Sequence, residues 1–198
     1  MCIRDRDVQI AFANELSLIA RRHGVNVWEI IRLANRHPRV TILQPGPGVG
    51  GHCIAVDPWF LIADTGSHEH SVMRAARELN DAMPAHCARL IAATARERGA
   101  RTVALLGMAY KADIDDCRES PSLGVFEALR REAPDLEVLC CEPNVSALNG
   151  ITLTPLAECL TRAQVAAILV AHREFREFAA NPPDGVTFID FKGLLSLP

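Results

Sequence analysis

The spacing of apolar residues predicts that the first half of the chain is helical. A first helix is expected from Asp7 to about Gly24, because apolar side chains recur along it every three or four positions. A second helix is expected after Asn26, which forms a capping-box pattern with Glu29, and should reach about Pro38. Together these helices would leave a large apolar patch exposed on a monomer, and this pattern leaves the oligomeric state open.

A third helical region is expected between Ser71 and Gly99. We expect an interruption at Pro84 and a resumption at Cys87, because proline removes a helix hydrogen bond. No stretch of the first hundred residues alternates as a sheet strand does, and residues 1–5 show neither a helical nor a strand pattern. Residues 1–99 are therefore predicted to form a helical domain.

After residue 99 the pattern changes to short apolar runs separated by helical segments. The runs typical of buried strands are Thr102–Leu106, Leu136–Cys140, Val165–Val170 and Val186–Phe191. Ser120 and Pro121 suit the N-cap and first position of a helix that reaches Leu129, and Leu156–Arg162 predicts another helix. This order predicts an α/β domain over residues 100–198, Rossmann-like, with an open parallel sheet.

Composition excludes several classes of function. The 198 residues are 49% hydrophobic, which is enough to build cores and excludes a disordered chain. A net charge of -3 without basic runs argues against nucleic acid and favours a small-molecule partner. No apolar run approaches the ~20 residues of a membrane span, and no secretion signal begins the chain, so we expect a cytoplasmic protein without membrane contact. The seven cysteines lack C-x-x-C spacing, and most are expected to be reduced thiols.

A glycine-rich stretch, PGPGVGGHCIAVDPWFL, joins the second and third helical regions. Gly46, Gly48 and Gly51 match the spacing of the dinucleotide fingerprint G-x-G-x-x-G. That fingerprint needs a strand before it and a helix directly after it, whereas the Asp57-Pro58 step opposes a helix. We therefore interpret the match as false and expect a loop whose backbone approaches a ligand closely.

This loop presents the candidate nucleophile, Cys53. A free thiol has a pKa of ~8.5, so its thiolate needs stabilisation, which His52 or backbone N–H groups would provide. Asp57, four residues later, either caps the next helix or holds and deprotonates a water, and the pattern leaves both roles open. The remaining cysteines interpreted as buried structural thiols are Cys87, Cys117, Cys140, Cys141 and Cys159.

Cationic residues occur at two places that suit an anionic ligand. Arg36, His37 and Arg39 form either an ordinary solvated helix end or an anion clamp. Lys111 and Arg118 lie on either side of a polar loop that follows a predicted strand, where a ligand would meet the carboxyl edge of the sheet.

No metal site is predicted from these residues. Asp113, Asp115 and Asp116 raise the alternative of magnesium, but the neighbouring cations would neutralise their carboxylates. The His-Cys pairs at 52/53 and 86/87 lack the spacing of zinc ligands.

Four ordered segments make the chain resemble the UDP-glucose/GDP-mannose dehydrogenase family. They are RDVQIAFANELSLIARRHGVNVWEIIRLANRHPRV, QPGPGVGGHCIAVDPWFL, ARELND and LGMAYKADIDDCRESP, and they cover nearly the whole chain from Arg6. Family members have an N-terminal NAD-binding Rossmann domain, a helical central domain that dimerises, and a C-terminal α/β domain that binds the UDP-sugar. The resemblance covers only the last two.

The resemblance implies a two-step oxidation of a sugar C6 alcohol to a carboxylate with two NAD and one water. Cys53 falls on the catalytic cysteine, which traps the intermediate aldehyde as a thiohemiacetal that is then oxidised to a thioester. Asp57 falls on the aspartate that assists the hydrolytic water, and Arg118 on an arginine that contacts NAD.

The resemblance also implies a set of substrate contacts. The positions matching them are Arg6, His37 and Arg39 at the sugar acid, with Arg39 reaching across the dimer; Ile42, Leu43, Gln44, Pro45, Gly46 and Gly50 along the sugar nucleotide; and Tyr110, Lys111 and Lys192 at the nucleotide. The residues that enter and leave the glycine loop resemble the branch acting on UDP-N-acetylmannosamine. UDP-N-acetylglucosamine and UDP-glucose are the alternative substrates, and the products of such enzymes serve surface polysaccharides.

One departure from the family pattern lies at the start of the chain. The family's catalytic lysine and asparagine precede the position of Arg6, and MCIRD does not continue the pattern. The expectation is therefore a truncated enzyme that lacks its NAD-binding domain and has no dehydrogenase activity alone. A non-catalytic module for dimerisation or UDP-sugar binding is the alternative.

Overall fold

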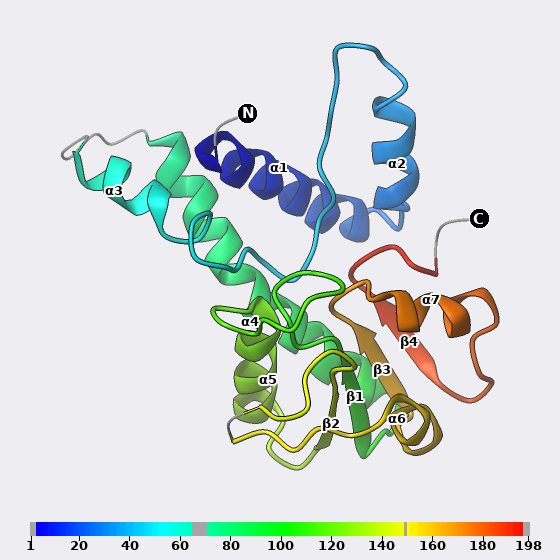
Figure 1. Ribbon diagram of the computed structural model, residues 1–198. Helices are drawn as coiled ribbons and strands as arrows, with labels where there is room; N and C mark the ends of the chain where they lie inside the picture. The colour runs from blue at the N-terminus through cyan, green and yellow to red at the C-terminus, as the bar shows by residue number, and fades with distance from the viewer. Residues whose placement is uncertain (1–2, 65–70, 149, 196–198) are drawn as a thin grey trace.

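Helices alone make up the first half of the chain where the structure describes it. The computed structural model describes residues 3–64, 71–148 and 150–195 (Figure 1). The helices of this half are α1 (Ile3–Arg22), α2 (Val27–Ala34), α3 (Asp57–Asp64) and α4 (Val72–Arg98). Asn26 caps α2 as expected, since its side chain accepts hydrogen bonds from the N–H groups of Trp28 and Glu29. The described residues before Thr102 contain no strand, which confirms the predicted helical half.

Three expectations about these helices are wrong. Helix α1 already begins at Ile3, inside the stretch where no pattern was recognised. Helix α3 begins at Asp57, although the Asp57-Pro58 step was expected to oppose a helix. Proline is tolerated in the first turn, because the N–H that it lacks would have no partner inside the helix there. Helix α4 continues through Pro84, whose ring lies where α5 approaches: a Cβ on Gly124 would lie 3.1 Å from the Pro84 Cβ. Packing on both sides of α4 outweighs the lost hydrogen bond.

Helix α1 buries a different face from the one that its apolar residues suggest. Ala11, Asp7 and Asn14 are buried against α4, whereas Phe12 is 54% exposed and Ile19 is 46% exposed. The apolar stripe is therefore partly on the surface of the single chain, and polar groups lie inside.

The second half is a four-stranded parallel sheet covered by helices on both faces. Its strands are β1 (Thr102–Leu106), β2 (Glu137–Cys141), β3 (Val165–Ile168) and β4 (Thr187–Asp190), in the order β2-β1-β3-β4. The helices are α5 (Pro121–Glu132), α6 (Leu156–Arg162) and α7 (Arg173–Ala180). The predicted strands, parallel pairing, α5 and α6 are confirmed, with end points shifted by a few residues; α7 was not anticipated.

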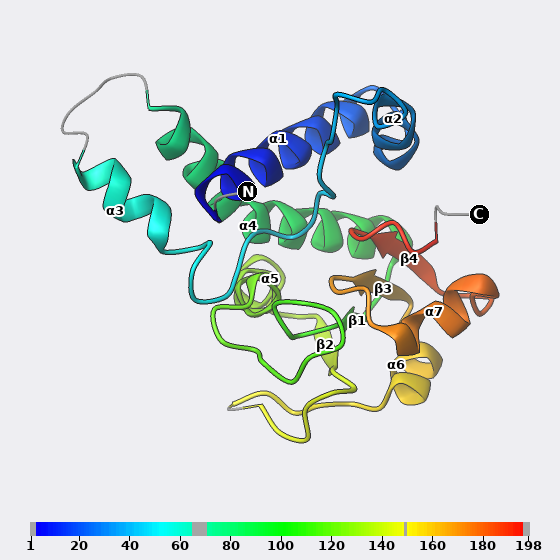
Figure 2. The same ribbon diagram turned by 45° about the horizontal axis from the view of Figure 1, so that its top comes forward.

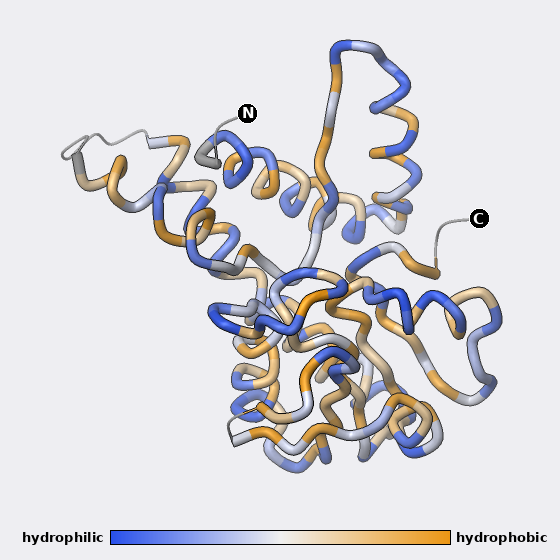
Figure 3. Tube along the Cα trace, viewed as in Figure 1, coloured by the Kyte–Doolittle hydropathy of each residue, from blue (hydrophilic) through white to orange (hydrophobic). Residues whose placement is uncertain are grey.

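Successive strand residues point to opposite faces of the sheet and pack into two separate hydrophobic cores. Leu105 and Ala167 pack with α4 and α5, while Leu106 and Ile168 pack with α6 and α7. Figure 3 shows the hydrophobic residues gathered along the strands. The chain leaves β1 toward β2 and then crosses to β3 on the other side of β1, so the strand order switches between β1 and β3. The crevice at the carboxyl ends of these two strands is where ligands bind in such sheets.

Helix α4 joins the two halves. It packs against α1 and α3 through one part and against α5 and β3 through another, and Figure 2 shows it between α1 and the layer formed by α5 and the sheet. Among the described residues, no helix combines the length and apolarity that a bilayer span requires. The cytoplasmic location stays a prediction.

Candidate functional site

The glycine-rich loop has no regular structure from Val40 to Gly50 and follows α2 rather than a strand. It therefore does not form a strand–G-x-G-x-x-G–helix unit, which confirms that the fingerprint match is false. The loop instead passes very close to the α/β half. A Cβ on Gly50 would lie 2.3 Å from the carbonyl oxygen of Glu119 and 3.1 Å from the Cβ of Tyr110. Only glycine permits this approach.

Cys53 is exposed at the far end of this loop, directly before α3. The N–H of Asp57 donates to the carbonyl oxygen of Cys53 (2.8 Å), so the thiol and the candidate carboxylate belong to one turn. The five other described cysteines are buried, and burial raises the pKa of both Cys87 and Cys140 to about 12. The expected contrast between one exposed thiol and buried ones is confirmed among the described residues.

Asp116 connects the glycine-rich loop that ends at Cys53, called the Cys53 loop below, to Arg118, the residue expected to contact NAD. Its carboxylate accepts hydrogen bonds from Arg118 Nη2 (2.7 Å) and Nε (3.0 Å), and it lies 3.9 Å from Nε2 of His52. The hydrogen bonds from Arg118 lower the pKa of Asp116 to about 2. Arg118, whose side chain is 70% exposed, thus contacts Asp116, which also lies near the residue that precedes the thiol.

A cleft of about 270 Å³ opens at the strand-order switch. Its walls come from the loops after β1, β3 and β4, the start of α5 and part of the glycine-rich loop. Predicted site residues that line it are Tyr110, Lys111 and Lys192, together with Pro47 and Gly48 of the glycine loop. The structure therefore brings the predicted nucleotide contacts together at the expected edge of the sheet.

Lys192 fixes the entry of the glycine loop to the end of β4. Its Nζ donates to the carbonyl oxygen of Pro45 (3.4 Å) and lies 3.0 Å from the position of a Cβ on Gly46. Burial lowers the pKa of Lys192, and the carboxylate of Asp190 opposes that change. An anionic ligand at this point would favour the charged lysine.

The other predicted contacts lie elsewhere. Arg6 is exposed on α1, and His37 and Arg39 are exposed in the turn after α2, where the Arg39 N–H donates to His37 Nδ1 (3.2 Å). None of the three lines the cleft. Nearby, the Asn35 side chain accepts from the N–H of Ile42 (2.7 Å) and donates to its carbonyl oxygen (3.0 Å). Leu43, which is half-buried, and Gln44, which is exposed, follow Ile42 in the chain. Neither of them lines the cleft.

A buried polar network behind the Cys53 loop was missed. Arg77 of α4 donates to Asp7 of α1 (2.6 Å) and to the carbonyl oxygen of Ile54 (3.4 Å). Asn14 Oδ1 accepts from the N–H of Gly46 (2.9 Å) and its Nδ2 donates to Asn80 (2.9 Å). The sequence places these polar residues in the same helices as several alanines, which by itself did not indicate that their side chains are buried.

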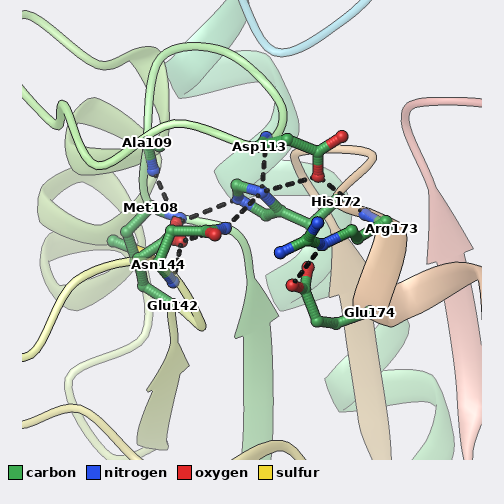
Figure 4. A network of polar contacts seen from close by, with 8 residues as sticks. All are labelled: Met108, Ala109, Asp113, Glu142, Asn144, His172, Arg173 and Glu174. Carbon is green, nitrogen blue, oxygen red and sulfur yellow. Dashed lines mark hydrogen bonds and ion pairs between the residues drawn. The ribbon is translucent and has the colours of Figure 1, made fainter.

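A second missed network lies behind the cleft and joins the ends of three strands (Figure 4). Glu142 follows β2, His172 follows β3, and both are buried among backbone groups of the loop after β1. Burial by itself raises the pKa of Glu142, but hydrogen bonds from His172 and from backbone N–H groups lower it below its ordinary value. Single residues after separate strands gave no sequence signal of this contact.

The described residues differ in how well they suit a metal or NAD. Ligand atoms of Asp113, His172 and Glu174 lie within 4.8 Å of one another. However, His172 Nδ1 already lies 3.0 Å from both the Asp113 N–H and the Asn144 amide nitrogen, so it offers a metal no free lone pair. For NAD, no dinucleotide-binding unit occurs among the described residues, and Arg118 is the one predicted contact.

Two family models match the chain. The model described as UDP-glucose/GDP-mannose dehydrogenase family, central domain, matches residues 5–82, and the UDP binding domain of the same family matches residues 104–196. The NDP-N-acetyl-D-galactosaminuronic acid dehydrogenase of Ralstonia nicotianae is 45% identical over 195 residues, covering 96% of this chain and 46% of that protein. The UDP-N-acetyl-D-mannosamine dehydrogenase of Salmonella typhi is 46% identical over 202 residues, covering 96% and 48%.

A solved structure shares the same arrangement. The UDP-D-ManNAc dehydrogenase of Pyrococcus horikoshii superposes with a TM-score of 0.80 at 34% identity, covering 96% of this chain and 49% of that one. The chain thus spans about half the length of the curated relatives that it matches.

Proposed function

This chain belongs to the UDP-glucose/GDP-mannose dehydrogenase family, and we propose that it supplies the substrate-binding and covalent part of an NAD-dependent UDP-N-acetyl-D-mannosamine 6-dehydrogenase. The proposal rests on one observation. A single loop lines the cleft at its start, with Lys111 and Lys192 beside it, and presents the exposed thiol of Cys53 at its end. A nucleotide held by the cleft would have its sugar directed along the loop toward the thiol.

The proposed chemistry divides between the thiol and the carboxylate. The Cys53 thiolate adds to the C6 aldehyde of the sugar and holds it as a thiohemiacetal. Asp57 holds the water that later hydrolyses the thioester to the carboxylate. NAD, when bound, accepts a hydride in each of the two oxidations. On this chain Arg118 would contact it.

Homodimer formation is part of the proposal. The exposed apolar residues Phe12 and Ile19 of α1 and Leu33 of α2 would be covered by a second copy. His37 and Arg39, which do not reach the cleft of their own chain, would then serve the partner's sugar. Arg6 would hold the sugar from α1.

The choice of sugar rests on the glycine loop. Its entry, Ile42–Gln44, and its exit, Ala55–Trp59, resemble the N-acetylmannosamine branch, and the relative from Salmonella typhi carries that substrate in its name. The Ralstonia nicotianae relative, at 45% identity, favours an N-acetylgalactosamine derivative as a second candidate. UDP-N-acetylglucosamine and UDP-glucose remain the alternatives from the sequence.

Protection of Cys53 from alkylation tests the proposal. We expect iodoacetamide to label Cys53 in the folded chain, and we expect the 6-aldehyde of UDP-N-acetylmannosamine to slow this labelling more than UDP does, measured by mass spectrometry of the peptide. Aldehydes of the competing UDP-sugars give the specificity order. Equal protection by UDP and by the aldehyde would argue against covalent capture.

A Cys53→Ala variant separates the enzyme from a non-catalytic binding module. The wild type and the Cys53→Ala variant should bind UDP with similar affinity in calorimetry, because the thiol lies outside the cleft. Only the enzyme reading predicts that the variant loses affinity for the aldehyde relative to UDP. Because no dinucleotide-binding unit occurs among the described residues, we expect the isolated chain to form no NADH; robust turnover would contradict the assignment of this chain to the substrate side.

A further inference from the structure

The polar network at the strand-order switch holds the cleft wall from behind. The wall segment Tyr110–Lys111 lies in the loop after β1, between two points that the network fixes. The first point is Met108–Ala109 and the second is Asp113. Figure 4 shows both points converging on Glu142 and His172, which come from the ends of β2 and β3.

Glu142 fixes the first point. One carboxylate oxygen, Oε2, accepts from the N–H groups of Met108 (2.7 Å) and Ala109 (2.9 Å) and lies 3.1 Å from Nε2 of His172. The other oxygen accepts from the N–H of Asn144 (3.0 Å). The side chain is fully buried, so its donors have no water to replace it.

His172 fixes the second point. Its Nδ1 lies 3.0 Å from the N–H of Asp113, which can only donate, so Nδ1 is the acceptor and Nε2 carries the proton given to Glu142. The Asn144 amide also points to Nδ1, at 3.0 Å. The imidazole is therefore a neutral link between the carboxylate and the far end of the wall.

The backbone at Asp113 shows that this end is held in place. Asp113 has φ of 60°, in the left-handed region that non-glycine residues seldom adopt. Its N–H is bound by His172, and its Oδ1 accepts from the N–H of Arg173 at the start of α7 (2.8 Å). Contacts from His172 and Arg173, the N-cap and first residue of α7, together keep a conformation that the loop alone would disfavour.

We propose that Glu142 and His172 are positioning residues that hold Tyr110 and Lys111 in the geometry for binding the nucleoside diphosphate. Neither side chain lines the cleft; each acts through backbone groups on both sides of the wall segment. The inference rests on the proposed function for the identity of the ligand. The ordering of the wall is a separate property, present without ligand.

The chain's single tyrosine gives a direct probe of that ordering. With 3-fluorotyrosine incorporated, ¹⁹F NMR reports Tyr110 as one resonance. We expect this resonance to be shifted away from its unfolded position in the wild type and to lie near that position in Glu142→Leu and His172→Leu. Calorimetry should show UDP binding weakened about tenfold in both variants, because buried backbone donors lose their acceptor. Glu142→Gln keeps an acceptor oxygen and should stay within about threefold of wild type.

Leu129→Ala provides the matched control. Leu129 is fully buried in α5 and makes none of the hydrogen bonds of this network, so its truncation should lower the melting temperature while leaving the acceptors of the wall's N–H groups in place. Measured well below its melting point, it should keep the wild-type ¹⁹F signal and UDP affinity. If Glu142→Leu keeps them too, the role is merely structural and the inference fails. If wild type does not bind UDP, the proposed function fails, while the ligand-free ¹⁹F signal still decides the positioning role.

Discussion

The Cys53 loop and the loop after β1 are both backed by buried polar networks, but they are held in different ways. The Cys53 loop is bound at Gly46 by Asn14 and at Ile54 by Arg77, and the thiol beside the second point is exposed. The loop after β1 is bound at Ala109 and Asp113, and the short segment between them forms a cleft wall. The thiol of Cys53 thus remains accessible, whereas the cleft wall is fixed.

The two networks also differ in charge. The helical network depends on a buried ion pair, and Asp7 Oδ2 has no hydrogen-bond partner among the described residues. Burial raises the pKa of Asp7, and the Arg77 guanidinium opposes that rise. In the other network a buried carboxylate is satisfied by neutral donors from the backbone and an imidazole. Loss of a partner should therefore cost most where an isolated charge is left behind.

The largest effect is expected for Arg77→Met. Removing the guanidinium leaves the Asp7 carboxylate buried without its cation, which should lower the free energy of unfolding by about 3–5 kcal/mol. Urea denaturation followed by circular dichroism measures this. Asp81→Asn is the control, since Asp81 contacts the same arginine from the surface (2.8 Å, with the Asp81 side chain 54% exposed). That exposed pair should contribute only about 0–1 kcal/mol, and equal losses from both variants would show that burial is not decisive.

A smaller effect is expected for Gly50→Ala, which tests where the two loops meet. A Cβ would lie 2.3 Å from the Glu119 carbonyl oxygen and 2.7 Å from Pro121 Cδ, so backbone must move. We expect a loss of about 1–3 kcal/mol in stability together with weaker UDP binding, measured by denaturation and calorimetry. Gly24→Ala meets no atom within 4 Å and has φ of +65°. Gly24→Ala should lower the free energy of unfolding by about 1–2 kcal/mol at most and leave UDP binding unchanged. If Gly24→Ala weakened UDP binding as much as Gly50→Ala does, the contact at Gly50 would be unimportant for binding.

The smallest effect is the pH dependence of Glu142. Its pKa is lowered in the folded protein, so the stability that it contributes is present above the ordinary glutamate pKa of about 4.3 and is lost as the pH falls through that value toward the folded one. Glu142→Gln removes this titration. The difference in urea midpoint between wild type and variant should therefore shrink as the pH is lowered below about 4. A difference that stays constant would contradict the assignment of the charge to Glu142.

The sequence by itself determined the elements whose signals are local. The caps at Asn26 and Ser120 marked the starts of two helices, and apolar periodicity indicated most of the others. The short apolar runs after residue 100 specified all four strands. Cys53 was identifiable as the candidate accessible thiol, because it follows a glycine-rich loop and lies outside the apolar helix and strand patterns that contain the other described cysteines. Short-range physics is sufficient for such features.

Only the tertiary structure decided the continuity of α4 through Pro84, the start of α3 at Asp57 and the burial of polar α1 residues. Each follows from packing against segments distant in sequence, which outweighs local preference. The contact of Glu142 with His172, 30 residues apart, has the same origin. Parallel strands bring their carboxyl ends to one edge, and which single residues meet there depends on strand order, a property that no local pattern encodes.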